Sequence, residues 1–87
     1  MYVVVVYDVG VKRVNKVKKL LRQYLIWIQN SVFEGELTEA ELMRLKNEIK
    51  RIVEKKEDAV HIYRIKSEKY LKKDTIGTPK AEPENIF

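Results

Sequence analysis

The run at residues 2–8, Tyr-Val-Val-Val-Val-Tyr-Asp, most constrains what this chain can fold into. Valine is stiff at χ1 and packs well on a pleated surface, so the run predicts a β-strand. A strand in an open sheet covered on one face alternates apolar with polar residues, whereas this strand is apolar on both faces. A chain of 87 residues has too few other elements to cover the second face. We therefore expect a sheet-to-sheet homodimer, in which the two Asp8 side chains lie near one another.

The remaining pattern predicts two helices and three further strands. Apolar residues at three-to-four-residue spacing predict a helix over residues 11–24, and residues 26–36 read as two short strands around a turn or as one long bulged strand. Thr38 and Glu41 form a capping box that begins a second helix, and a last core strand covers residues 59–65. Right-handed crossovers then place both helices on one face of a four-stranded sheet, which is an α+β fold of the ferredoxin-like βαββαβ type.

The C-terminal part differs in composition from the rest of the chain. We expect residues 1–77 to form one domain that ends in a short additional edge strand at residues 75–77, and residues 78–87, which contain both prolines, to form a flexible tail. The tail ends in the apolar residues Ile86 and Phe87, so docking on a partner and disorder are both open for it.

Cysteine content and hydropathy limit the function classes. The chain has no cysteine, which excludes a disulfide framework, a thiolate metal site and a thiol nucleophile. The apolar N-terminal run is too short, and lacks the preceding basic residues, for a signal peptide or a membrane span. We expect a cytoplasmic protein that does not contact the membrane.

The net charge of +5 is concentrated in one segment. Residues 1–33 carry six basic residues against one acidic residue, whereas residues 34–87 carry twelve of each. On the predicted first helix, Lys12, Lys16 and Lys19 share one stripe, with Arg22 beside it. A basic segment of this kind in an otherwise balanced chain is typical of a surface that binds nucleic-acid phosphates, and the alternative is a solvated helix face.

Asp8 is the candidate for chemistry, and two interpretations compete for it. Its carboxylate could cap the following helix, because Asp is a favoured cap residue. Alternatively, two Asp8 carboxylates, one from each copy, hold Mg²⁺ (or Mn²⁺), which proteins bind through one or two carboxylates together with water and phosphate oxygens. The only histidine, His61, lies within a predicted strand, where we expect a structural role. No triad set, Walker loop or GxGxxG motif occurs.

Two motifs in order carry a resemblance to a known family. The strand that ends in Tyr7-Asp8 is followed by the basic helix and by the segment Gln-Asn-Ser-Val-Phe-Glu-Gly at residues 29–35. Further on come Asp58, Ile-Tyr-Arg at residues 62–64, and Ile76-Gly77. Over residues 1–77 the chain resembles the small CRISPR-associated proteins of the second Cas family.

The resemblance implies a homodimer whose C-terminal strand adds to the partner's sheet. It implies a central subunit of the complex that integrates new spacers into CRISPR arrays, bound to the integrase subunit. It also implies a Mg²⁺-dependent endonuclease on RNA or DNA, with Asp8 as the catalytic and metal residue. Duplex DNA is the expected nucleic-acid partner, and single-stranded RNA is a further candidate. Many members have glycine where this chain has Leu25, a departure that concerns the turn.

The candidate site residues fall into a nucleic-acid-binding set and a supporting motif. Arg13 matches a basic position of the family, and Phe33 matches an aromatic residue near the aspartate. The candidate nucleic-acid-binding residues are Lys12, Arg13, Lys16, Lys19 and Arg22; the supporting motif is Tyr7, Gln29, Ser31 and Phe33. Two hypotheses follow: a metal-dependent nuclease, which needs Asp8, and a non-enzymatic scaffold for the integrase subunit, which needs the basic stripe. A third hypothesis, a small-molecule-sensing domain of the same fold, is disfavoured by the excess of basic residues, which favours a phosphate-containing partner.

Overall fold

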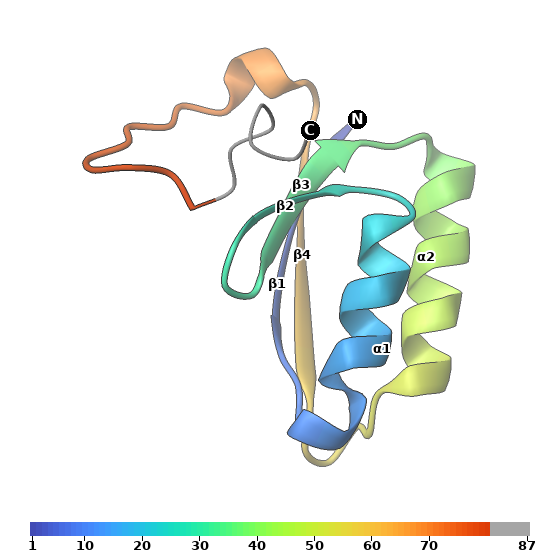
Figure 1. Ribbon diagram of the computed structural model, residues 1–87. Coiled ribbons are helices and arrows are strands. Elements are labelled where there is room, and N and C mark those ends of the chain that lie inside the picture. Colours follow the sequence, from blue (N-terminus) through green and yellow to red (C-terminus); the bar gives the residue numbers. More distant parts are fainter. Residues whose placement is uncertain (81–87) are drawn as a thin grey trace.

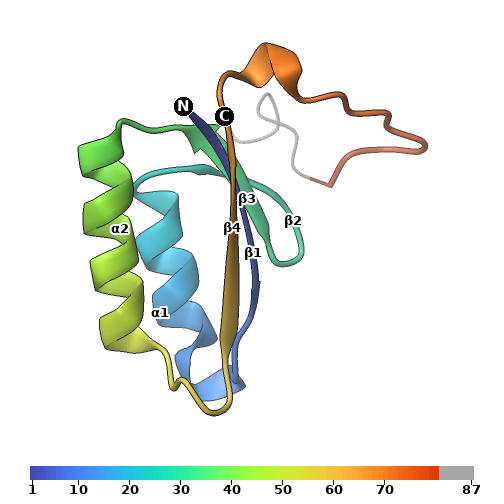
Figure 2. The ribbon, with the colours of Figure 1, turned by 180° about the vertical axis from the view of Figure 1, so that it is seen from behind.

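The computed structural model describes residues 1–80, which form one antiparallel sheet covered by two helices on one face (Figure 1). The elements are β1 (Tyr2–Asp8), α1 (Val11–Arg22), β2 (Ile26–Gln29), β3 (Val32–Glu36), α2 (Glu39–Ile52) and β4 (Ala59–Ile65), followed by a short 3₁₀ helix (Glu68–Tyr70). The strands lie in the order β2-β3-β1-β4. Seen from behind, α1 and α2 pack side by side on the same face (Figure 2). The ferredoxin-like arrangement is confirmed.

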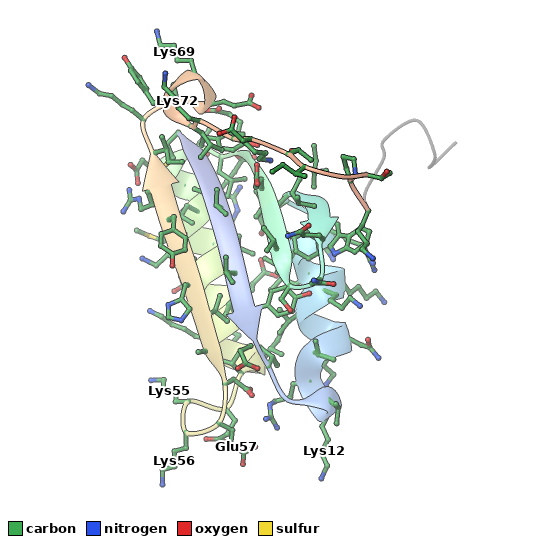
Figure 3. The ribbon with its side chains drawn as sticks, turned by 90° about the vertical axis from the view of Figure 1, so that its left-hand side faces the viewer. Lys12, Lys55, Lys56, Glu57, Lys69 and Lys72 are labelled. Atoms are coloured by element: carbon green, nitrogen blue, oxygen red, sulfur yellow. The ribbon has the colours of Figure 1, made fainter. Side chains whose placement is uncertain are left out.

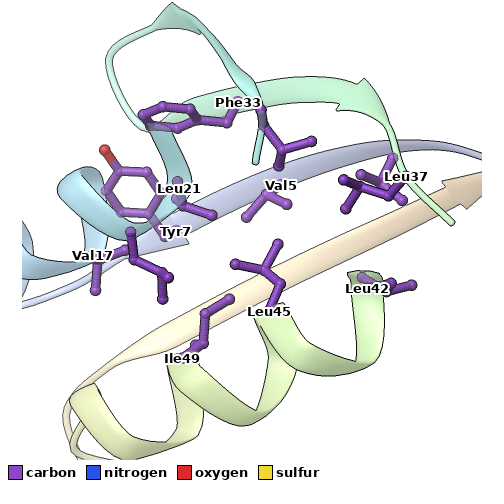
Figure 4. Packing of buried hydrophobic residues seen from close by; sticks show 12 residues of the cluster. Val5, Tyr7, Val17, Leu21, Phe33, Leu37, Leu42, Leu45 and Ile49 are labelled. Carbon is purple, nitrogen blue, oxygen red and sulfur yellow. The ribbon is translucent and has the colours of Figure 1, made fainter. Parts of the chain in front are cut away.

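The valine run forms the central strand β1, and its two sets of side chains have different surroundings. Val3, Val5 and Tyr7 are buried beneath the helices, whereas Tyr2, Val4 and Val6 lie partly exposed on the open face of the sheet. The buried set packs against Leu21 and Leu45 of the helices and against Phe33 of β3, among others (Figure 4). The second apolar face of β1 is thus uncovered in the single chain, as the sequence pattern predicts.

The segment between the helices forms two strands, and it also contains a bulge. β2 and β3 pair around a turn at Asn30, whose positive φ of 35° is a conformation that asparagine tolerates. The pairing register shifts between Trp27 and Gln29, so each of the two alternatives describes part of the segment. Leu25, between α1 and β2, is buried. A Cβ on Gly35 of β3 would approach the Leu25 side chain to 2.9 Å, so glycine at position 35 makes room for leucine at position 25.

The predicted capping box starts α2. The Glu41 amide donates to the Thr38 hydroxyl, and the Thr38 amide donates to the Glu41 carboxylate. These contacts lower the pKa of Glu41, with the Thr38 amide as the first cause. Because both partners satisfy backbone amides that a helix start leaves free, the capping box fixes where α2 begins.

After β4 the chain runs to residue 80 without forming another strand. The predicted edge strand at residues 75–77 is therefore not formed within the single chain, where Ile76 is 100% exposed. The resemblance places that strand on a partner's sheet, and the structure contains a single chain. The predicted tail, residues 78–87, lies outside the described residues from residue 81 onward. Up to residue 80, no helix has both the length and the hydropathy that crossing a bilayer requires.

Candidate metal and nucleic-acid site

Asp8 ends β1 with an exposed side chain. It pairs with Ala59 of β4, and its position in the alternation places it on the open face of the sheet, like Val4 and Val6. The helix-cap interpretation of Asp8 is wrong, because α1 begins at an N-cap Gly10 and no side chain caps it. The Asp8 carboxylate is thus not engaged by the start of α1.

The neighbouring carboxylate Asp58 ties the start of α1 to the loop before β4. The Gly10 amide donates to Asp58 Oδ1 at 2.9 Å, and the Glu54 amide donates to Asp58 Oδ2 at 2.8 Å. Arg13 donates through Nε at 2.6 Å and through Nη2 at 2.9 Å, and the side chain of Asp58 has no exposed surface. The Arg13 guanidinium and the two amides hold the pKa of Asp58 well below its usual range.

Arg13 is engaged within its own chain. Besides Asp58 it contacts Glu57 at 3.1 Å, and the hydrogen bonds to these carboxylates raise its pKa. The carboxylates of Asp58 and Glu57 occupy Nε and Nη2 of Arg13 and offset its charge, so the guanidinium is less available to a phosphate than a lysine without an acidic partner. This placement gives Arg13 a structural role, and its role in binding nucleic acid stays a prediction.

The only histidine of the chain, His61, lies on the open face of the sheet near Asp8. His61 of β4 pairs with Val6, so it lies on the same face as Asp8, and it is exposed rather than part of the core. Within residues 1–80, no three His, Asp or Glu side chains gather closely enough to hold a metal ion. One chain thus contributes the single carboxylate of Asp8, which fits a Mg²⁺ site of one or two carboxylates completed by water and phosphate oxygens.

The supporting motif lies behind and beside Asp8. Tyr7 and Phe33 are buried core residues whose ring centroids lie 6.1 Å apart, and burial raises the pKa of Tyr7. Phe33 therefore packs under the sheet instead of lining the Asp8 side. The carbonyl of Ser31 accepts a hydrogen bond from the Tyr7 amide at 3.1 Å, and Gln29 is exposed at the end of β2. The motif holds the β2–β3 turn against the end of β1.

The basic stripe of α1 is exposed. Lys12, Lys16, Lys19 and Arg22 all have exposed side chains, and in the part of the chain that the structure describes none of them forms an ion pair. Lys12 projects from the end of the molecule that also carries Lys55 and Lys56 (Figure 3). Four cations on one helix without carboxylate partners remain available to phosphates.

Glu34 belongs to the motif at residues 29–35, but it is not among the predicted site residues. It pairs with Val4 on the open face and is only 6% exposed. The Tyr2 hydroxyl donates to it at 3.0 Å, and Lys73 Nζ lies 3.0 Å from its Oε2. Burial, and then the hydrogen bond to Glu34, raise the pKa of Tyr2 well above its usual range. The signal in the sequence is a carboxylate next to the apolar pair Val32 and Phe33 of β3, and Glu34 is where Lys73 of the C-terminal segment is attached.

Comparison with known proteins gives consistent matches over the whole length. The family model described as CRISPR associated protein Cas2 matches residues 1–73. A CRISPR-associated endoribonuclease Cas2 from Methanosarcina acetivorans is 52% identical over 87 residues and one from Pyrococcus furiosus is 54% identical, each covering 100% of both chains. A crystal structure of a Cas2 protein, 51% identical, superposes with a TM-score of 0.85 over 94% of this chain and 92% of that one. Streptococcus pyogenes Cas2 has a TM-score of 0.77 at 34% identity over 88% of this chain and 100% of that one.

Proposed function

Because the chain belongs to the CRISPR-associated Cas2 family, we propose that it is a homodimeric nucleic-acid-binding protein of CRISPR adaptation that cleaves phosphodiester bonds with Mg²⁺ (or Mn²⁺) at Asp8. The curated relatives are named endoribonucleases, which favours RNA as the cleaved substrate. Such an enzyme needs a carboxylate that is free to bind a cation and a surface that holds a phosphate backbone.

The observation that carries the proposal is that Asp58, and not Asp8, forms the hydrogen bonds at the start of α1. Asp58 accepts hydrogen bonds from Gly10 and Arg13. Asp8 accepts no hydrogen bond from the start of α1 and is exposed at the end of β1. A solvent-facing carboxylate at the end of a central strand is positioned to bind a cation together with an incoming phosphate. When bound, Mg²⁺ would polarise the phosphodiester and supply an activated water.

The open face of the sheet supports the homodimer. Tyr2, Val4 and Val6 of β1 and Tyr63 and Ile65 of β4 lie on it, and Tyr63 is 57% exposed in the single chain. A second copy stacked on this face would bury these side chains and would bring a second Asp8 to the same end of the interface. Asp8 is thus proposed as the catalytic and metal-binding residue of each copy.

A second candidate function is a non-enzymatic DNA-binding scaffold for the integrase subunit of the spacer integration complex. The exposed row of Lys12, Lys16, Lys19 and Arg22 favours it, because helix cations of this kind hold duplex phosphates without reading the base sequence. In that case the protein needs the α1 row and does not need Asp8.

Replacement of Asp8 by asparagine separates the two functions. Asp8→Asn is nearly isosteric and removes the charge. We therefore expect Mg²⁺-dependent cleavage of labelled single-stranded RNA and duplex DNA to fall by at least about 100-fold, which is typical for the loss of a catalytic group. Nucleic-acid binding should persist. Asp74→Asn, an exposed aspartate outside the site, is the matched control and should cleave like the wild type. Equal cleavage by the Asp8→Asn variant would leave only the scaffold.

A further inference from the structure

The imidazole ring of His61 lies within reach of the site at Asp8. His61 pairs with Val6, two positions along β4 from Ala59, which is the partner of Asp8. Asp8 and His61 are therefore diagonal neighbours on the open face of the sheet. Figure 3 shows β1 and β4 side by side, with the helices behind them. Diagonal neighbours in an antiparallel pair lie about 7–8 Å apart, a separation that an aromatic ring can span.

The His61 ring has no structural task in the described part of the chain. Its side chain is exposed, so the packing of the core does not depend on it. Within residues 1–80, neither His61 nor Asp8 forms an ion pair, either with the other or with a third residue. The space between the two side chains leaves room for a cation and one phosphate oxygen, which together extend about 4 Å over two metal–oxygen bonds.

Cleavage of a phosphodiester needs a proton donor as well as a cation. The oxygen that leaves phosphorus is an alkoxide unless it takes up a proton while the bond breaks. Asp8 cannot supply this proton while its carboxylate binds the cation. Mg²⁺ prefers oxygen ligands, so a neighbouring imidazole is left free of the cation. Histidine is also the side chain most often used for general acid–base catalysis.

We propose that His61 donates a proton to the leaving oxygen during cleavage at Asp8. Water adds to phosphorus and loses a proton to solvent, the bond from phosphorus to the leaving oxygen breaks, and that oxygen takes the proton of the His61 imidazolium. A proton from solvent then restores the imidazolium, and the products are a phosphate monoester and an alcohol. This inference rests on the proposed function and deepens it, because it adds a second catalytic residue to the same site.

Substrates with sulfur at the cleaved bond test the proton transfer in the full-length protein. His61→Gln keeps a polar side chain that cannot transfer a proton, so cleavage of an ordinary oligonucleotide should fall by about 100-fold. Two further oligonucleotides carry sulfur in place of the 5′ or the 3′ bridging oxygen at the mapped cleavage position. One of them releases a thiolate, which leaves more readily than an alkoxide and needs no proton. We expect His61→Gln to cleave that substrate nearly as fast as the wild type does.

The matched control is Lys66→Gln, which alters an exposed residue beyond the end of β4 and should cleave all three substrates like the wild type. Equal cleavage of the ordinary oligonucleotide by His61→Gln and the wild type would overturn the inference. A loss of the same size on all three substrates would also overturn it, because His61 would then not act on the leaving oxygen.

A measurement on the wild-type protein tests the position of His61 without cleavage. The chain contains one histidine, so its ring protons give a single set of NMR signals in a symmetric dimer, and bound Mn²⁺ broadens the signals of nearby protons. We expect substoichiometric Mn²⁺ to broaden the His61 signals in the wild type and to leave them sharp in Asp8→Asn.

The NMR result separates this inference from the proposed function. If the wild type binds Mn²⁺ through Asp8 and the His61 signals stay sharp, His61 lies outside the site, and this inference fails while the proposed function stands. Equal broadening in the wild type and in Asp8→Asn would place a cation at His61 independently of Asp8 and would refute the shared site. If neither Mn²⁺ binding nor cleavage depends on Asp8, the proposed function fails and this inference fails with it.

Discussion

At the scale of single residues, the surroundings of two aspartates distinguish a structural carboxylate from a candidate catalytic one. Asp58 has no exposed surface and accepts hydrogen bonds from Arg13, Gly10 and Glu54. Asp8 is exposed and caps no helix. Because Asp8 is the last residue of β1 and Asp58 directly precedes β4, residue type and position in the sequence do not distinguish them. The donors that approach each carboxylate do.

The lowered pKa of Asp58 predicts acid-sensitive stability. A carboxyl group whose folded pKa lies below its unfolded value of about 3.9 stabilises the fold above that value, and the stabilisation is lost as the pH falls through about 4 toward the lowered folded pKa. In urea titrations, Asp58→Asn should lower the unfolding midpoint at pH 7, and its difference from the wild type should shrink progressively as the pH falls from about 4 to about 2. Asp74→Asn should follow the wild type at both pH values. A constant difference between Asp58→Asn and wild type across this range would show that the Asp58 charge does not stabilise the fold.

At the scale of elements, α1 performs two tasks with its two faces. Val17, Leu20 and Leu21 bury one face in the core, and the other face presents the lysines of the basic row. Arg13 lies between the two faces and turns toward the α2–β4 loop. Within the described residues, the lysines of the basic row have no carboxylate partner and can bind phosphates, whereas Arg13 is paired with Asp58 and Glu57.

The salt dependence of binding tests the α1 row. If Lys12, Lys16 and Lys19 of both copies contact phosphates, six contacts give a slope of log K against log salt of up to roughly −5, at about −0.9 per contact. Replacing the three lysines by glutamine should flatten the slope and weaken binding equally for unrelated duplex sequences. The triple change Lys66, Lys69 and Lys72 to glutamine lowers the net charge equally and should leave the slope in place. An unchanged slope in the α1 variant would make the row a solvated helix face.

The elements themselves follow from local patterns, whereas several contacts at the site do not. Valine content predicts β1, and Thr38 with Glu41 predicts the start of α2, because each signal lies within a few residues. The bond between Arg13 and Asp58 joins residues 45 positions apart, so no local pattern assigns Arg13 to it. The same holds for Lys73 and Glu34, 39 positions apart. The valine run placed Asp8 at the end of β1, the resemblance implied its catalytic role, and the fold then showed which side of the sheet it faces.

At the scale of the whole molecule, the uncovered apolar face of the sheet predicts assembly. Tyr63→Glu places a charge at the centre of the proposed interface, opposite Val4. We expect this variant to have a mass near 10.4 kDa by light scattering at micromolar concentration, where the wild type should have about twice that mass. Tyr70→Glu alters a tyrosine of similar exposure outside the sheet and should remain dimeric. A monomeric wild type would remove the basis for a shared Asp8 site.

The account holds that two Asp8 carboxylates, one from each copy, act in a single site. Wild-type chain and Asp8→Asn chain can be mixed in equal amounts, allowed to exchange subunits and assayed for Mg²⁺-dependent cleavage. About a quarter of the dimers would then contain two intact chains, by random pairing in a two-fold dimer. We predict that activity per total protein falls to about a quarter of the wild-type value. Activity near one half would show that each Asp8 acts alone and would contradict the shared site.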